Sequence, residues 1–153
     1  MKITSALFPT IAATFMVACS GADSREAKTR KEQEVEFNKA FGFHPPATIT
    51  TINHTYLSSR NVIDRSYDEW LSFTFEQASF DKIIRGKYKQ AQNIAMPDES
   101  ESPAWWPKAN PSGTVLFFRS QDDTSTDEGF QFQEYIWHDK ASGLVFFHKS
   151  YWG

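Results

Sequence analysis

Aromatic and polar residues alternate most clearly at the carboxyl end of the chain, in residues 130–138 and 144–152. Alternation of this kind is typical of half-buried β-strands. Gly143 lies at the end of the intervening turn, where a left-handed backbone closes a four-residue hairpin loop. Pairing across this turn predicts the following facing residues: Asp139 with Leu144, Trp137 with Phe146, Ile136 with Phe147, Tyr135 with His148, and Glu134 with Lys149. The opposite charges of the last pair favour this register.

Three earlier segments also have the pattern of strands. Residues 69–76 place Leu71, Phe73 and Phe75 on one face and polar residues on the other. Residues 48–58 are rich in β-branched residues, and residues 113–120 are apolar on both faces, which is typical of a central strand. The charged residues 60–68 and 121–129 are expected to form loops between these strands.

Two segments have helical spacing. Phe37, Ala40 and Phe41 share one helix face, and the helix is expected to end at Gly42. A second helix is expected after residue 78, with Ser79 as its cap and these apolar residues along one stripe: Phe80, Ile83, Ile84 and Tyr88. The elements together predict an α+β fold, a curved antiparallel sheet of about five strands with an N-terminal helix and one further helix packed on one face. Several small cystatin-like and cone-shaped folds are similar in outline.

The first residues of the chain have the layout of a secretory signal. Lys2 is followed by residues 3–17, which are uncharged and largely apolar. The segment is too short to span a bilayer, because a spanning helix needs about 20 apolar residues. It ends at the only cysteine of the chain, in the tetrapeptide Met16-Val17-Ala18-Cys19.

This tetrapeptide resembles the lipobox of bacterial prolipoproteins. The resemblance implies cleavage before Cys19 and acylation of its thiol and new amine with fatty acids such as palmitate. Ser20 after the cysteine implies an outer membrane lipoprotein that faces the periplasm. In the alternative, an ordinary signal peptidase reads Ser20-Gly21-Ala22 and cuts after Ala22, which would give a soluble periplasmic or secreted protein.

The expected organisation is a signal peptide at residues 1–18, a lipid anchor and tether at 19–36, and a single α+β domain at 37–153. Loss of Lys2 with the signal leaves 15 basic against 19 acidic residues, a net charge of −4. This balance argues against nucleic acid as a partner, because nucleic-acid binding needs clustered cations. A single cysteine permits no internal disulfide, so stability has to come from packing, with 14 Phe, five Trp and five Tyr as the main material.

The chain contains no motif of a catalytic or metal site. HExxH, CxxC and GxSxG spacings are absent from the sequence, and in the register above His138 and His148 point to opposite faces of the hairpin. We therefore expect no catalytic residue, no metal, no cofactor and no enzyme. A cleft that placed His54 or His148 beside two carboxylates would indicate an enzyme instead.

Trp105 and Trp106 lie in a proline-rich connection and are the candidate binding residues. Such a pair can bind a partner, or it can fold back and plug the sheet, and the sequence leaves both possibilities open. The expected function is a membrane-anchored, non-catalytic module that binds another envelope protein, of the inhibitor, immunity or assembly-partner type. The alternative is a periplasmic binder of an apolar or sugar ligand in an aromatic concavity of the sheet. An exposed apolar patch with an acidic rim would favour the first, and a closed aromatic pocket of about 300 Å³ or more would favour the second.

Overall fold

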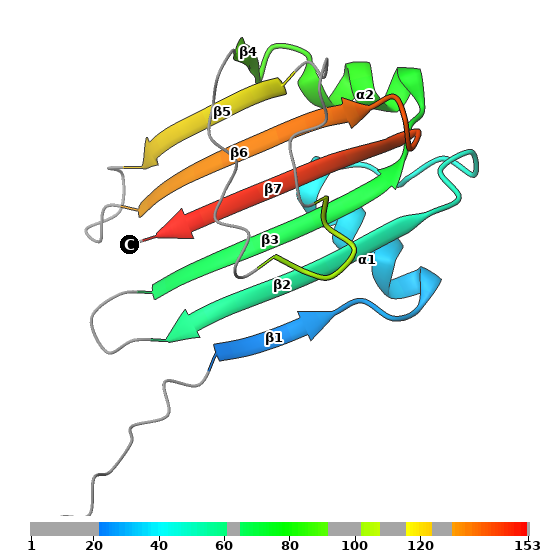
Figure 1. Ribbon diagram of the computed structural model, residues 1–153. Coiled ribbons are helices and arrows are strands. Elements are labelled where there is room, and N and C mark those ends of the chain that lie inside the picture. Colours follow the sequence, from blue (N-terminus) through cyan, green and yellow to red (C-terminus); the bar gives the residue numbers. More distant parts are fainter. Residues whose placement is uncertain (1–21, 61–64, 92–101, 108–115, 124–129, 153) are drawn as a thin grey trace, which may run out of the picture.

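The structure is a computed structural model, and it describes residues 22–60, 65–91, 102–107, 116–123 and 130–152. These residues form seven antiparallel strands and two helices, with their connections (Figure 1). The strands form one open sheet in the order β1-β2-β3-β7-β6-β5-β4. Their bounds are β1 Ala22–Glu26, β2 Ile52–Arg60, β3 Arg65–Thr74, β4 Lys89–Ala91, β5 Leu116–Asp123, β6 Phe130–Asp139 and β7 Leu144–Trp152; the helices are α1 Arg30–Phe41 and α2 Gln77–Ile84. The predicted α+β class and antiparallel sheet are confirmed.

The five strands expected from the sequence are all present, and the sheet has two more, β1 and β4, at its edges. Both extra strands are short and polar, so they lack the apolar alternation that marks a buried strand. Charged residues are also what keeps an exposed sheet edge from pairing with another chain. Residues 60–68 are not all loop, because β2 continues to Arg60 and β3 begins at Arg65.

The amino-terminal boundary of the folded region differs from the expected one. Residues 22–26 pair with β2, with Ala22 opposite Ser59 and Glu26 opposite Thr55, and α1 begins at Arg30. The segment expected to be a tether up to residue 36 therefore contributes a strand and the first turns of a helix. Its polar residues suit an edge strand and an exposed helix face, which is why the sequence pattern resembles a linker.

The predicted β6–β7 register is confirmed at every pair. Asp139 lies opposite Leu144, Trp137 opposite Phe146, and Glu134 opposite Lys149. Gly143 has a φ of 68°, the left-handed conformation that the short connection requires.

The ends of both helices have local explanations. Thr29 caps α1 in a capping box with Glu32, and Gly42, with a φ of 77°, ends it as predicted. The cap of α2 is Glu76 rather than Ser79, because its carboxylate accepts hydrogen bonds from the backbone N–H groups of Ala78 and Ser79. A carboxylate offers two acceptors at a helix end that carries partial positive charge.

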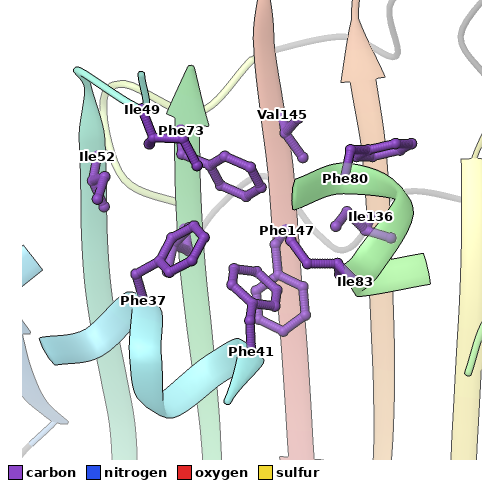
Figure 2. Packing of buried hydrophobic residues seen from close by; sticks show 11 residues of the cluster. Phe37, Phe41, Ile49, Ile52, Phe73, Phe80, Ile83, Ile136, Val145 and Phe147 are labelled. Carbon is purple, nitrogen blue, oxygen red and sulfur yellow. The ribbon is translucent and has the colours of Figure 1, made fainter. Parts of the chain in front are cut away.

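Both helices pack on the same face of the sheet and form the larger core (Figure 2). Phe37 and Phe41 of α1 lie against Phe73 and Phe147, with ring centroids 5.1–5.6 Å apart in edge-to-face geometry. Aromatic pairs prefer this arrangement, which adds about 0.5–1.5 kcal/mol per pair beyond burial. Phe80 and Ile83 of α2 cover the part of the same face that lies over Ile136.

A second apolar cluster covers the opposite face of the sheet. Trp70, Trp137 and Phe146 project from β3, β6 and β7, and Trp106 packs on them from residues 102–107. In Figure 1 this yellow-green segment crosses the face of the sheet away from α1. The sheet is therefore buried on both faces, which explains the use of aromatics at odd and even positions of the same strands.

Cys19 and the rest of the lipobox lie outside the described residues, so their processing stays a prediction. Neither α1 nor α2 is long and apolar enough to cross a membrane.

Candidate functional site

The helix-bearing face of the sheet continues beyond the area that the helices cover, and there it becomes polar. The pairing of neighbouring strands aligns one residue from each of six strands in a single row, and paired residues of antiparallel strands share a face. Across the sheet from β1 to β5 this row reads Arg25, Tyr56, Glu69, Lys149, Glu134 and Arg119. From β3 to β5 the charges alternate in sign.

A cleft of about 520 Å³ lies over the first four residues of this row, beside α1. Its walls are unusually rich in charge for a cavity of this size. Three carboxylates, three cations, one histidine and two tyrosines line it, together with Ala40 and Phe147: Asp23, Glu36, Glu69, Arg25, Lys39, Lys149, His54, Tyr56 and Tyr67. Because the two sets of charged residues are equal in number, the lining has no formal net charge with His54 neutral.

His54 and Glu69 form the inner contact of the cleft. Nε2 of His54 is hydrogen-bonded to Oε1 of Glu69 at 3.0 Å, across the β2–β3 pair. His54 is 4% exposed, and its Nδ1 is buried with no hydrogen-bond partner among the described residues. The imidazole therefore holds the Glu69 carboxylate in a fixed position and presents no nitrogen to solvent.

Each of the three cations of the cleft forms an ion pair with one of two carboxylates, Glu36 or Glu134. Nζ of Lys39 lies 2.9 Å from Glu36 one helical turn away, and the Arg25 guanidinium lies 3.9 Å from the same carboxylate. Nζ of Lys149 lies 3.5 Å from Glu134. These ion pairs fix where positive charge sits in the cleft.

Tyr67 belongs to a stack of tyrosines beside the row, and it lies two residues before Glu69 on β3. Its ring stacks on Tyr151 with a centroid separation of 4.6 Å, and Tyr56 lies on its other side at 5.4 Å. Burial, and next the nearby Tyr151 and Glu69, raise the pKa of Tyr67 to about 12. Its hydroxyl thus remains a hydrogen-bond donor throughout the physiological range.

Glu134 anchors the neighbouring part of the polar face. Its carboxylate accepts a hydrogen bond from the Tyr88 hydroxyl at 2.8 Å and lies 3.5 Å from the Arg119 guanidinium. Burial and the adjacent Glu134 raise the pKa of Tyr88 well above its ordinary value. Two cations and one phenol surround a nearly buried carboxylate, so this network is a structural centre with little space for a ligand.

A separate polar network lies under the tryptophans on the opposite face. Nε2 of His148 is hydrogen-bonded to Oδ1 of Asp68 at 3.0 Å, and the Ser150 hydroxyl donates to the same oxygen at 2.7 Å. His148 is 1% exposed and contacts the rings of Trp70 and Trp106. As the register predicted, it lies on the other face from His138, which stacks on Phe75.

The two tryptophans singled out from the sequence lie away from the cleft. Trp106 is 3% exposed and packs edge-on against Trp137 and Phe146. Trp105 is partly exposed and borders the same cluster. This is the packing expected of a segment that plugs the sheet, while binding through Trp105 stays a prediction.

The residues of the cleft were not predicted as a group. Of the residues that line it, the sequence singles out only His54 as a candidate for chemistry, and Glu69, Glu36 and Tyr67 belong to no motif. The available signal was the position of Glu69 on the same strand face as Leu71 and Phe73, where an apolar residue would otherwise be expected. A charged residue that continues an apolar face marks the point where the core gives way to a cleft.

Among the described residues no group of three His, Cys, Asp or Glu side chains is arranged to hold a metal ion. Comparisons of the chain with models of protein families, with curated proteins and with solved structures gave no match.

Proposed function

We propose that the chain is an envelope lipoprotein, anchored through Cys19, whose domain binds a small polar ligand in the cleft and performs no chemistry on it. The cleft is the observation that supports this function. Its volume of about 520 Å³ lies in the range of small-molecule sites, and several polar groups converge on it from different elements.

The surface of the described residues favours a small ligand over a protein partner. Val35, at 43% exposure, is the only exposed large hydrophobic residue among them. Stable docking surfaces usually carry a contiguous apolar patch, and a single valine does not form one. The expected inhibitor, immunity or assembly role would therefore depend on polar contacts or on Trp105.

The packing of the tyrosines in the cleft favours a polar ligand over an apolar one. Tyr67 has other tyrosines near both faces of its ring, so its face is not available to stack on an apolar molecule or a sugar ring. Tyr67 lines the cleft and its hydroxyl stays protonated. Hydrogen bonds and charge therefore dominate recognition.

An enzyme is the second candidate, because one cleft gathers His54, Arg25 and three carboxylates, although Glu69 is the only one of the three that is hydrogen-bonded to His54. That combination is what an active site requires. General acid–base catalysis, however, needs a nitrogen within hydrogen-bond reach of the substrate. In His54 one nitrogen is engaged by Glu69 and the other is buried, which favours binding without catalysis.

The position of β1 supports the lipoprotein route. Two residues, Ser20 and Gly21, separate Cys19 from β1, and they extend over at most about 7 Å. An acylated Cys19 would hold the β1 edge of the sheet close to the bilayer, on the periplasmic side of the outer membrane if Ser20 directs sorting. Cleavage after Ala22 would instead cut within β1, which pairs from Ala22 onward.

Native mass spectrometry of the full-length protein, purified in non-ionic detergent, tests the function. A small molecule should be released from the wild-type protein. It should be lost from an Ala40→Leu variant, because Ala40 lines the cleft and the larger side chain occupies its volume. Ala78→Leu, at an exposed position of α2, is the matched control. If both variants retain the molecule, or if the wild type carries none and binds none, the cleft is not the functional site.

A further inference from the structure

The charges of the cleft are segregated. Its lysines and arginine all pair with Glu36 or Glu134. In contrast, no lysine or arginine of the described chain lies within ion-pair distance of Asp23 or Glu69, and His54 is the hydrogen-bond partner of Glu69. One part of the cleft is thus left negative, and another part has two cations that share one carboxylate.

Glu69 lies deeper in the cleft than Lys39 and Arg25, whereas Asp23 is exposed and Lys149, opposite Glu69 in the register, is partly buried. The Glu69 side chain is 16% exposed, whereas those of Lys39 and Arg25 are 60% and 70% exposed. A largely buried carboxylate with no lysine or arginine in ion-pair contact favours a cationic ligand, because burial removes the water that would otherwise solvate its charge. The inner wall therefore attracts a cation, and the rim attracts an anion.

We infer that the cleft binds a small zwitterion, with its ammonium group on Glu69 and its acidic group at the rim beside Lys39 and Arg25. The ammonium forms charge-assisted hydrogen bonds with the carboxylate. Tyr56 lies opposite Glu69 in the register and Tyr67 lies two residues before Glu69 on the same face, so both tyrosines line the cleft beside this carboxylate. The equal numbers of carboxylates and cations in the lining match a ligand without net charge. The inference rests on the proposed function and names its ligand class.

Isothermal titration calorimetry of the full-length protein in non-ionic detergent tests the inference with three probes of similar length. These are 4-aminobutyrate, which carries both charges, n-butylammonium chloride, which carries the cation alone, and sodium butyrate, which carries the anion alone. We expect 4-aminobutyrate to bind most tightly, n-butylammonium more weakly and butyrate least. Raising the salt concentration should weaken all binding, because exposed charges are screened.

Single substitutions test the binding of the ammonium end and of the acidic end of the ligand separately. Glu69→Gln keeps a hydrogen-bonding group beside His54 but removes the charge, and it should weaken 4-aminobutyrate and n-butylammonium roughly tenfold or more. Lys39→Gln should weaken only the probes that carry a carboxylate, by a few-fold, because the lysine is exposed. Glu34→Gln, on the exposed side of α1, is the matched control and should bind all probes as the wild type does.

Asp23→Asn keeps the inference testable if Glu69→Gln does not fold, because Asp23 is exposed on an edge strand. It should weaken the two amine probes and leave butyrate unchanged. The inference is overturned if butyrate binds as tightly as 4-aminobutyrate, or if neither carboxylate variant weakens the amines. If none of the probes binds while the Ala40→Leu variant loses a co-purified ligand, the zwitterion is wrong and the cleft remains the binding site. If Ala40→Leu also has no effect, both proposals fail.

Discussion

Nε2 of His148 lies 3.0 Å from Oδ1 of Asp68, although 80 positions separate the two residues in the chain. Asp68 also accepts a hydrogen bond from the Ser150 hydroxyl. The carboxylate therefore stands between the serine and the imidazole. A nucleophilic serine requires the opposite order, with the imidazole in contact with the hydroxyl. The three residues form a buried structural network that joins β3 to β7.

Asp68→Ala should destabilise the fold by about 1–3 kcal/mol, because it leaves the buried His148 and the partly buried Ser150 without their hydrogen-bond acceptor. Urea denaturation followed by circular dichroism measures the change in the free energy of unfolding. Glu34→Ala, which removes an exposed carboxylate from α1, is the control and should change stability by less than about 0.5 kcal/mol. Equal effects of the two substitutions would show that the Asp68 network contributes nothing.

Trp106→Ala should lower the free energy of unfolding by about 3–5 kcal/mol, the range for truncating a buried aromatic side chain. The reason is its burial against Trp137 and Phe146. Trp105→Ala should cost clearly less, because Trp105 is only partly buried. Thermal denaturation of the two variants makes the comparison. If Trp106→Ala unfolds at the wild-type temperature, the segment does not plug the sheet, and its role as a binding segment is favoured.

The stability of the protein should rise with pH in the range just below 6.5, in part because of His138. Burial, and next the nearby Lys140, lower the pKa of His138 below its ordinary value of 6.5. Between the two values the unfolded state binds more protons than the folded state, so raising the pH favours folding. The contribution of neutral His138 is fully present above 6.5 and is lost as the pH falls through the folded-state pKa.

His138→Phe tests this contribution, because a phenyl ring can replace the imidazole that stacks on Phe75 at 3.7 Å. The slope of unfolding free energy against pH, measured by urea denaturation between pH 5 and 7, should be smaller in the variant. An unchanged slope would assign the pH dependence to other groups.

Cys19→Ser should abolish attachment to the membrane if Cys19 is the acylated residue. The wild-type protein is expected in the membrane fraction with a mass that includes fatty acyl chains, since several acyl chains hold a protein durably. The variant should lack the mass of the acyl chains, and the mature form should disappear from the membrane fraction. Fractionation and intact-mass measurement decide the outcome, and identical mass and distribution in the two proteins would refute the lipoprotein assignment.

Local periodicity was enough to predict the central strands. The β6–β7 hairpin could be predicted to the residue because Gly143 and the alternation of the two aromatic runs admit one register. The end of α1 at Gly42 follows from a local stop signal in the same way. The edge strands β1 and β4 could not be predicted, because their polar residues have no local strand pattern and their pairing depends on the rest of the sheet.

The cleft required knowledge of the whole sheet. His54 and Glu69 lie 15 positions apart and meet only because β2 and β3 pair in one register. Glu36 and Lys39 reach the same space because Phe37 and Phe41 fix the rotation of α1 on the sheet. No residue spacing along the chain predicts these contacts.

The sequence by itself determined the antiparallel class, the hairpin register and the apolar faces of the central strands and helices, because these depend on periodicity and on backbone preferences acting over a few neighbouring positions. The tertiary structure alone decided that Trp106 is buried, that β1 belongs to the sheet, and that the charged residues of four elements line one cleft. The physical reason is that strand pairing and helix packing join residues far apart in the chain, and the free energy of those contacts depends on all the joined elements at once.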